Sequence, residues 1–208
     1  MMGHCEMPAK KEGLVAEVRE FLHNLTTELP LIFSPASAKP KPERRLKTLP
    51  YRGRDVALCV IEAPELRRSE IARDDDVLVL RRGADRAEPQ TVLRKWLIDR
   101  ARETFIERAA YWAPRLGVGY RRLSIRDQRT VWGSCTKAGD LNFNWRLIMA
   151  SCATFDYLVI HELAHLREMN HSKRFWAHVQ RHCPDWRRHR RWLREHSRRL
   201  KTAVRRAS

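Results

Sequence analysis

The chain has 208 residues and carries 42 Lys and Arg against 25 Asp and Glu, a formal net charge of +17. A hydrophobic fraction of 43% and seven Trp argue against a disordered protein. No apolar run reaches the ~18 residues of a membrane span, and the N-terminus lacks the apolar core of a secretory signal. Five scattered cysteines without a CxxC pair argue against a disulfide framework, so we expect a cytoplasmic protein.

The first part of the chain is predicted to be an appendage to the folded domain. Apolar residues at helical spacing predict an amphipathic helix over residues 12–29, and Pro30 ends it. A linker-like stretch rich in Pro, Ser, Ala and Lys follows. We therefore predict two parts: an appendage over residues 1–48, partly helical or poorly ordered, and a folded domain over residues 49–208.

The domain begins with β-rich runs and one long helix. Residues 56–61 and 77–80 are predicted strands of one small sheet. Apolar residues then recur every four positions in a predicted helix with Pro89 in its first turn, and Pro114, Gly117 and Gly119 close it. Alternation resumes at residues 123–125 and 141–147, and the turn residues 137–140 predict that these two runs pair as a hairpin.

Helices dominate the rest of the chain. Thr154 is a predicted cap for a helix that runs to about Arg167, and Ser172 for a second. A third helix is predicted from Trp186 to about Val204.

The chemistry is concentrated in His161-Glu162-Leu163-Ala164-His165, an HExxH motif. On a helix, positions i and i+4 share one face, so both imidazoles can reach one ion. Two nitrogen ligands suit Zn²⁺. Glu162 lies about 100° around the helix from His161. It is therefore placed beside the metal, where it can act as general base on a water that zinc activates.

A zinc site needs a third protein ligand, and His171 is the first choice. The spacing HExxHxxxxxH equals the first-to-third histidine spacing of metzincins, although Glu168 stands where those enzymes have their turn glycine. Glu168, His178, His182 and Cys183 are the alternatives. Three protein ligands would leave the fourth position open to water, which is the catalytic arrangement.

The sequence around these residues resembles the YgjP-like family of small zinc metallopeptidase domains, which is related to the SprT-like and WLM metalloproteases. The matching segments are residues 161–166, 170–172 and 174–176, the upstream WGSC at 132–135, residues 141–146 and Pro184-Asp185-Trp186. The resemblance covers roughly residues 50–195. It implies an α+β, zincin-like domain in which a small sheet packs on the HExxH helix. It also implies His161, His165 and His171 as zinc ligands and Glu162 as catalytic base.

In zincins a sheet edge beside the metal accepts the substrate backbone as an added strand. The predicted strand 141–147 is the candidate, with Asn142 and Asn144 facing the cleft; an ordinary half-buried strand is the equal alternative. The WGSC segment is interpreted as packing and a tight turn, and a nucleophilic Ser134 or Cys135 is not expected. Tyr157 and Arg167 are candidates for stabilising the oxyanion.

The C-terminal segment is strongly basic. Ten of the 20 residues from Arg187 to Arg206 are Lys or Arg, against one acid, Glu195. This pattern predicts sequence-independent contact with nucleic acid through phosphates. Alternatively, an apolar stripe containing Trp186, Leu193 and Leu200 docks the helix and leaves arginines in solvent. Both can hold together, and we expect this helix to lie away from the metal chemistry.

The leading functional hypothesis is a zinc-dependent metallopeptidase that acts on a peptide or unfolded protein substrate. Two alternatives use the same fold. One is a non-catalytic, zinc-stabilised module closed by a fourth ligand such as Cys183 or Cys152. The other is a basic nucleic-acid-binding module. No membrane partner is expected.

Overall fold

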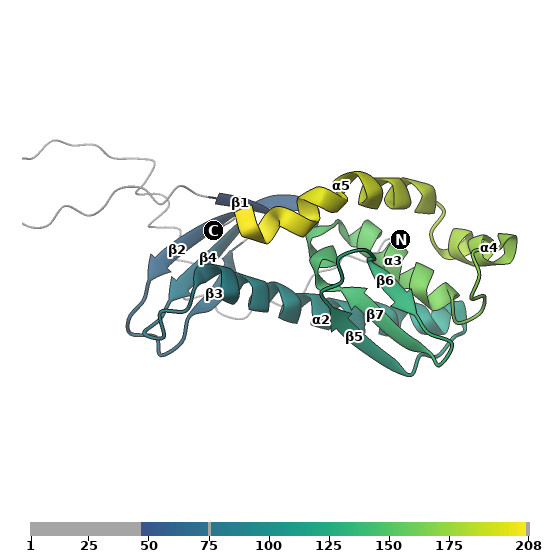
Figure 1. Cartoon of the computed structure of the whole chain (residues 1–208), viewed down its shortest axis with the longest axis horizontal. Helices are drawn as coiled ribbons and strands as arrows, with labels where there is room; N and C mark the ends of the chain where they lie inside the picture. Colours follow the sequence, from purple (N-terminus) through teal and green to yellow (C-terminus); the bar gives the residue numbers. More distant parts are fainter. Residues whose placement is uncertain (1–46, 75, 207–208) are drawn as a thin grey trace, which may run out of the picture. The chain divides into compact units, whose positions relative to one another are not determined.

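The computed structural model describes residues 47–74 and 76–206 (Figure 1). In chain order the elements are β1 (Lys47–Tyr51), β2 (Arg54–Glu62), β3 (Glu70–Asp74), β4 (Val77–Arg82), α2 (Pro89–Leu116), β5 (Arg122–Arg126), β6 (Gly133–Cys135), β7 (Asp140–Asn144), the 3-10 helix η1 (Trp145–Met149), α3 (Cys152–Ala164), α4 (Lys173–His182) and α5 (Trp186–Arg206). The predicted α+β class is confirmed. The helix predicted over residues 12–29 lies outside the described residues.

The first sheet has the strand order β1-β2-β4-β3. β2 and β4 run parallel, as neighbours, and the two outer pairs are antiparallel. The two predicted runs, 56–61 and 77–80, are therefore central strands of one sheet, as expected. The outer strands lacked a sequence signal because β1 contains Pro50 and β3 is largely polar.

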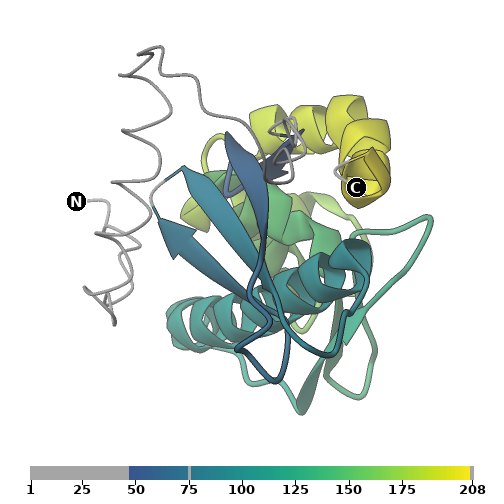
Figure 2. The ribbon, with the colours of Figure 1, turned by 90° about the vertical axis from the view of Figure 1, so that its left-hand side faces the viewer.

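Helix α2 packs against both sheets, as Figures 1 and 2 show. Its period-four apolar residues are all buried: Leu93, Leu97, Ala101, Phe105 and Ala109. Pro89 occupies the first turn, where its missing N–H costs nothing. Gly117 caps the other end in the left-handed conformation with φ 64°. The predicted start is confirmed; of the residues predicted to close the helix, Gly117 is the cap and Pro114 lies inside the last turn.

The second sheet differs from the prediction. Its order is β5-β7-β6, and β5 pairs with β7 in parallel. The antiparallel hairpin is instead β6 with β7. Two strands in parallel need a crossover, and here the crossover itself supplies the short strand β6. β7 also ends earlier than predicted, because the Asn144 side chain caps η1 by accepting a hydrogen bond from the Arg146 N–H.

The three C-terminal helices agree with the prediction except at the ends of α3. Ser151, not Thr154, caps α3, which ends at Ala164 rather than Arg167. Ser172 caps α4 as predicted. Along α5, Trp186, Leu193 and Leu200 are buried, so the docking stripe is confirmed and the arginines between them stay exposed.

The helices and the second sheet meet on the side chain of Phe105 in α2. Its ring lies 4.2 Å from that of Phe143 in β7 and 4.1 Å from that of Phe155 in α3, measured between centroids. A bidentate ion pair from Arg108 to Asp156, with both contacts at 2.6 Å, further joins α2 to α3. These contacts set the position of α3 against the sheet.

We expect Phe105→Ala to lower the free energy of unfolding by about 3–5 kcal/mol, because a fully buried ring that bridges three elements leaves a cavity. Ile106→Ala is the matched control on the same helix. Its side chain is 51% exposed, so we expect a change within about 0.5 kcal/mol. Urea unfolding followed by circular dichroism measures both. Similar losses for the two variants would show that Phe105 does not organise the core.

Candidate metal centre

Three histidines from α3 and the loop after it converge at one point. Their ligand nitrogens, from His161, His165 and His171, all lie within 4.8 Å of one another. The Nε2 atoms of His161 and His171 are 3.1 Å apart. A tetrahedral ion with Zn–N bonds of about 2.0–2.1 Å sets its nitrogens roughly 3.3 Å apart. The donor set therefore fits a single zinc ion.

The protonation state of these side chains also suits metal binding. Nδ1 of His165 lies 3.2 Å from the carbonyl oxygen of Glu168. Since a carbonyl only accepts, Nδ1 carries the proton and Nε2 keeps its lone pair. Burial, reinforced by the other two histidines and Arg190, lowers the pKa of His161 to about 3. Burial also lowers the pKa of His165. Neutral imidazole, the form that ligates metals, is favoured.

Glu162 is buried beside the histidines. Its side chain is 4% exposed, and burial raises its pKa to about 8. The space for the carboxylate comes from Gly133 in β6. A Cβ placed there would stand 2.5 Å from Oε1 and 2.8 Å from Cγ of Glu162, closer than atoms can pack. Strand β6 can approach the HExxH helix only because this position is glycine.

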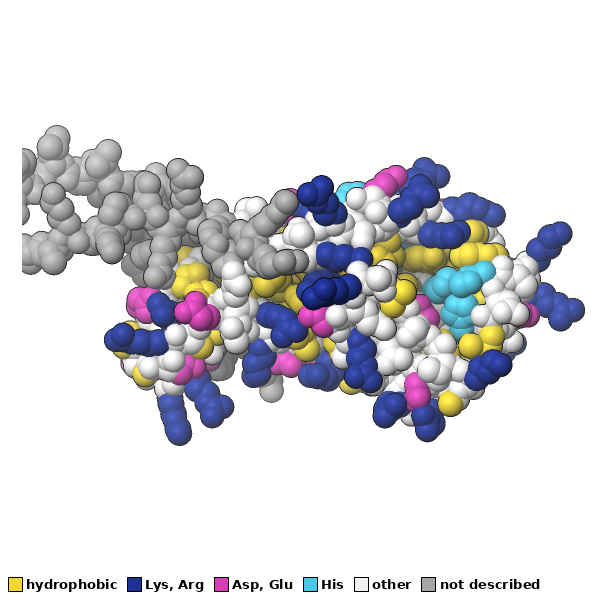
Figure 3. All heavy atoms as spheres, in the orientation of Figure 1, with side chains coloured by type: hydrophobic (Ala, Val, Ile, Leu, Met, Phe, Trp, Pro, Cys, Tyr) yellow, Lys and Arg dark blue, Asp and Glu magenta, His cyan; other side chains and the backbone are white. Residues whose placement is uncertain are grey.

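The basic helix passes close to the histidines. His171 stacks on Trp176, and Trp176 stacks on Trp186 at 3.9 Å between ring centroids. The Arg190 guanidinium lies 5.3 Å from the Trp176 ring centre. In Figure 3 a group of histidines (cyan) adjoins a band of hydrophobic side chains (yellow) flanked by Lys and Arg (dark blue). The expectation that α5 lies away from the metal chemistry is therefore wrong for its first turns.

A family model described as the YgjP-like metallopeptidase domain matches residues 10–196. The chain belongs to the YgjP-like family. No curated protein and no solved structure matches significantly. The match starts before the motifs that carry the resemblance, and so it includes part of the segment predicted as an appendage. The domain boundary at residue 48 stays a prediction.

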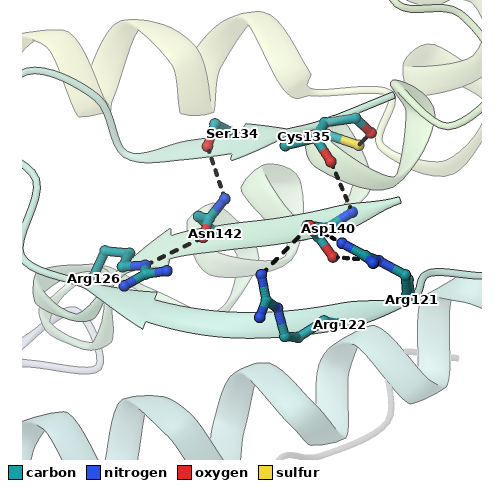
Figure 4. A network of polar contacts seen from close by, with 8 residues as sticks. Arg121, Arg122, Arg126, Ser134, Cys135, Asp140 and Asn142 are labelled. Carbon is teal, nitrogen blue, oxygen red and sulfur yellow. Dashed lines mark hydrogen bonds and ion pairs between the residues drawn. The ribbon is translucent and has the colours of Figure 1, made fainter. Parts of the chain in front are cut away.

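The substrate strand expected in this YgjP-like domain is not a sheet edge. β7 is the central strand, paired on both sides, so it has no free backbone groups to offer. Asn142 pairs with Ser134, whereas Gly133 faces Glu162. Because neighbouring residues alternate between faces, Asn142 lies on the face turned away from α3. Figure 4 shows it between the side chains of Ser134 and Arg126, with which it makes hydrogen bonds of 3.4 and 3.3 Å.

Asn144 has a structural role as well. Its side chain is completely buried. The amide nitrogen donates to the carbonyl oxygen of Gln128 at 2.6 Å, and the amide oxygen accepts from the Arg146 N–H at 3.1 Å. Those bonds fix the β5–β6 connection and start η1. The expectation that Asn142 and Asn144 face the cleft is therefore wrong.

β6 is an edge strand of the second sheet and contacts α3, the helix that carries the HExxH motif. Its hydrogen bonds to β7 come from the flanking pairs: the Asn144 N–H donates to the Trp132 carbonyl and the Thr136 N–H to the Asp140 carbonyl. Hydrogen-bonded and non-hydrogen-bonded residue pairs alternate along an antiparallel ladder. Ser134 therefore also points its backbone N–H and C=O groups at β7, whereas Gly133 and Cys135 point theirs outward. The WGSC segment, interpreted from sequence as packing and a turn, is this edge. The only sequence signal for it was the glycine.

The other predicted residues divide into those near the centre and those directed elsewhere. Tyr157 is buried, with its ring 5.9 Å from that of His161, and burial raises its pKa to about 12, so its hydroxyl keeps its proton. Arg167 donates to the Gly117 carbonyl at 3.1 Å. Burial, aided by the nearby Glu162 and Asp140, raises the pKa of Cys135 to about 11, so it stays a thiol. Among the described residues, the metal-binding group contains no cysteine.

We expect His171→Ala to weaken zinc binding by more than about 100-fold, since losing even an outer-shell partner costs 10–100-fold. His178→Ala, on the next helix and an alternative ligand by sequence, is the matched control and should bind zinc as the wild type does. Competition with a chromogenic zinc chelator measures both, and circular dichroism checks folding. Unchanged affinity of the His171 variant would exclude it as a ligand.

Proposed function

We propose that this YgjP-like domain is a zinc-dependent metallopeptidase that hydrolyses peptide bonds in peptide or unfolded protein substrates. The observation that carries the proposal is the buried Glu162 carboxylate, which lies beside three convergent histidines and below a free sheet edge. His161, His165 and His171 would hold the metal. Zinc bound there would polarise the peptide carbonyl and lower the pKa of water.

Glu162 is the proposed general base. Its carboxylate takes a proton from the attacking water and returns it to the nitrogen of the leaving amine, so that no charged amide nitrogen has to depart. Burial alone raises the pKa of the Glu162 carboxyl, and a cation held by the three histidines would lower it again, so that the carboxylate is ionised and can accept the proton. Gly133 supplies the room the carboxylate occupies, and Tyr157 keeps a neutral hydroxyl near His161.

The substrate backbone would bind along β6. A substrate bound as an added strand would form backbone hydrogen bonds with the outward N–H and C=O groups of two residues, Gly133 and Cys135. One of those residues is the glycine against which Glu162 packs, so a peptide bound at this edge passes the carboxylate. Because β6 has only three residues, it can pair with only a short extended segment, such as one in an unfolded chain.

We expect Glu162→Gln to reduce cleavage of a fluorogenic unfolded protein by about 10²–10⁴-fold, because the amide cannot accept a proton. Zinc content should not change, since Glu162 is not a ligand. Glu107→Gln is the matched control: it removes one exposed carboxylate on α2 and should retain full activity. Equal cleavage by wild type and the Glu162 variant would overturn the proposal and point to a contaminating protease.

A second prediction concerns the free edge of β6. Cys135→Pro removes one outward N–H without breaking the β6–β7 ladder, so kcat/KM should fall roughly 3- to 10-fold, the value of one hydrogen bond. Cys135→Ala keeps the N–H and should stay within about twofold of wild type. Ser134→Pro instead removes a ladder donor and should lower the melting temperature. If Cys135→Pro has wild-type kinetics, substrate does not use this edge.

Contact between α5 and nucleic acid stays a prediction. The helix exposes arginines at positions 188, 191, 194 and 198, and no acidic side chain of the described residues lies within ion-pair distance of them. None of the helices in the described part of the chain is long and apolar enough to cross a membrane. The cytoplasmic location also stays a prediction.

A further inference from the structure

A large cavity lies apart from the histidines. It has a volume of about 750 Å³ and forms where the first turns of α2, the β5–β6 connection, η1 and the last turns of α5 meet. None of the histidines of the metal centre, nor Glu162, lines it. On the face drawn in Figure 3, Lys and Arg side chains (dark blue) gather where the end of α5 lies near the start of α2.

The lining of this cavity is strongly cationic. Arg94, Arg129, Arg146 and Lys201 line it against one carboxylate, Asp127, a net charge of +3. Burial opposes ionisation of Asp127, but hydrogen bonds from Arg146 and Arg94 hold the pKa of its carboxyl below its usual value. Arg129 and Lys201 have no acidic side chain within ion-pair distance in the described ranges 47–74 and 76–206.

Two of the guanidinium groups are held in place before any ligand arrives. Arg146 is only 18% exposed along its side chain, pairs with Asp127 and lies 4.4 Å from the Trp145 ring centre. Arg94 donates to the same carboxylate at 2.9 Å and lies 5.9 Å from that ring. Fixed donors lose little conformational entropy on binding. These features distinguish the cavity from mobile surface charge.

Helix α2 adds to the positive potential. Its first turn lines the cavity through Gln90 and Thr91. The helix is 28 residues long, has no acidic residue in its first turn, and the Glu88 side chain makes no capping hydrogen bond. The N-terminus of a helix carries about half a positive charge and favours phosphate.

We propose that this cavity binds a phosphate group. A dianion is a better match than a single carboxylate for a lining of net charge +3, and planar guanidinium groups bind phosphate oxygens in pairs. The phosphate can belong to a small phosphorylated molecule or to a nucleic-acid backbone, which share this chemistry. The inference does not depend on the proposed peptidase activity.

The test is isothermal titration calorimetry of the full chain at low salt, with inorganic phosphate in one arm and a 12-nucleotide oligothymidylate in the other. The double variant Arg129→Gln, Lys201→Gln should bind at least one of the two at least tenfold more weakly than wild type. The double variant Arg67→Gln, Lys137→Gln removes the same charge at exposed sites elsewhere and should bind as wild type does. Because zinc itself can bind phosphate, the comparison between variants is the readout.

Thr91→Asp gives an independent check. An acid in the first turn favours the helix, so the melting temperature should hold or rise while affinity falls at least tenfold. If the cavity variants lose affinity for inorganic phosphate, the cavity recognises the phosphate group itself. If they lose affinity for the oligonucleotide alone, the phosphate that the cavity binds belongs to a nucleic-acid backbone. Absence of saturable binding to wild type in both arms, undiminished binding by the cavity variants, or equal loss in the charge-matched control would each overturn the proposal.

Discussion

Phe105 packs against Phe143 and Phe155, and these two contacts hold helices α2 and α3 against the second sheet. They bring α2, the central strand β7 and α3 to one point, each through a fully or almost fully buried ring. With β7 fixed, its partner β6 is fixed too, and with α3 fixed, so is the face that carries the HExxH motif. The relative position of the sheet edge and the three histidines thus follows from core packing, not from contacts within the site.

The same packing buries the side chain of Glu162. An ionised carboxylate is costly to bury without a partner. Gly133 lets the strand approach closely enough to exclude water, and the pKa of the carboxyl rises as a result. A metal ion held by the neighbouring histidines would offset this cost with its positive charge. This cost fits the proposal that the neighbouring histidines hold a metal cation.

The high positive charge of the chain has more than one role in the fold. Along α5, Trp186, Leu193 and Leu200 anchor the helix, so its arginines are displayed in fixed positions. Near the start of the helix, Arg190 adds its charge to the aromatic stack beside the histidines. Near its end, Lys201 joins arginines from α2 and η1 around the cationic cavity. The fold thus divides the positive charge of α5 between the histidine cluster and the cationic cavity.

Local features could be predicted from the sequence, because each depends on neighbours a few residues apart: the period-four stripe of α2, the Ser172 cap, the apolar seam of α5 and the HExxH spacing. The sequence did not determine which strand would be the edge. Residues 123–125 and 141–147 have the same alternation whether they pair in parallel or as a hairpin, and three residues of β6 are too few for a pattern. Only tertiary packing placed Gly133 against Glu162, turned Asn142 to the opposite face, and gathered four cations from α2, the β5–β6 connection, η1 and α5 around one cavity. These contacts join distant segments, and their energies depend on packing that no short stretch of sequence contains.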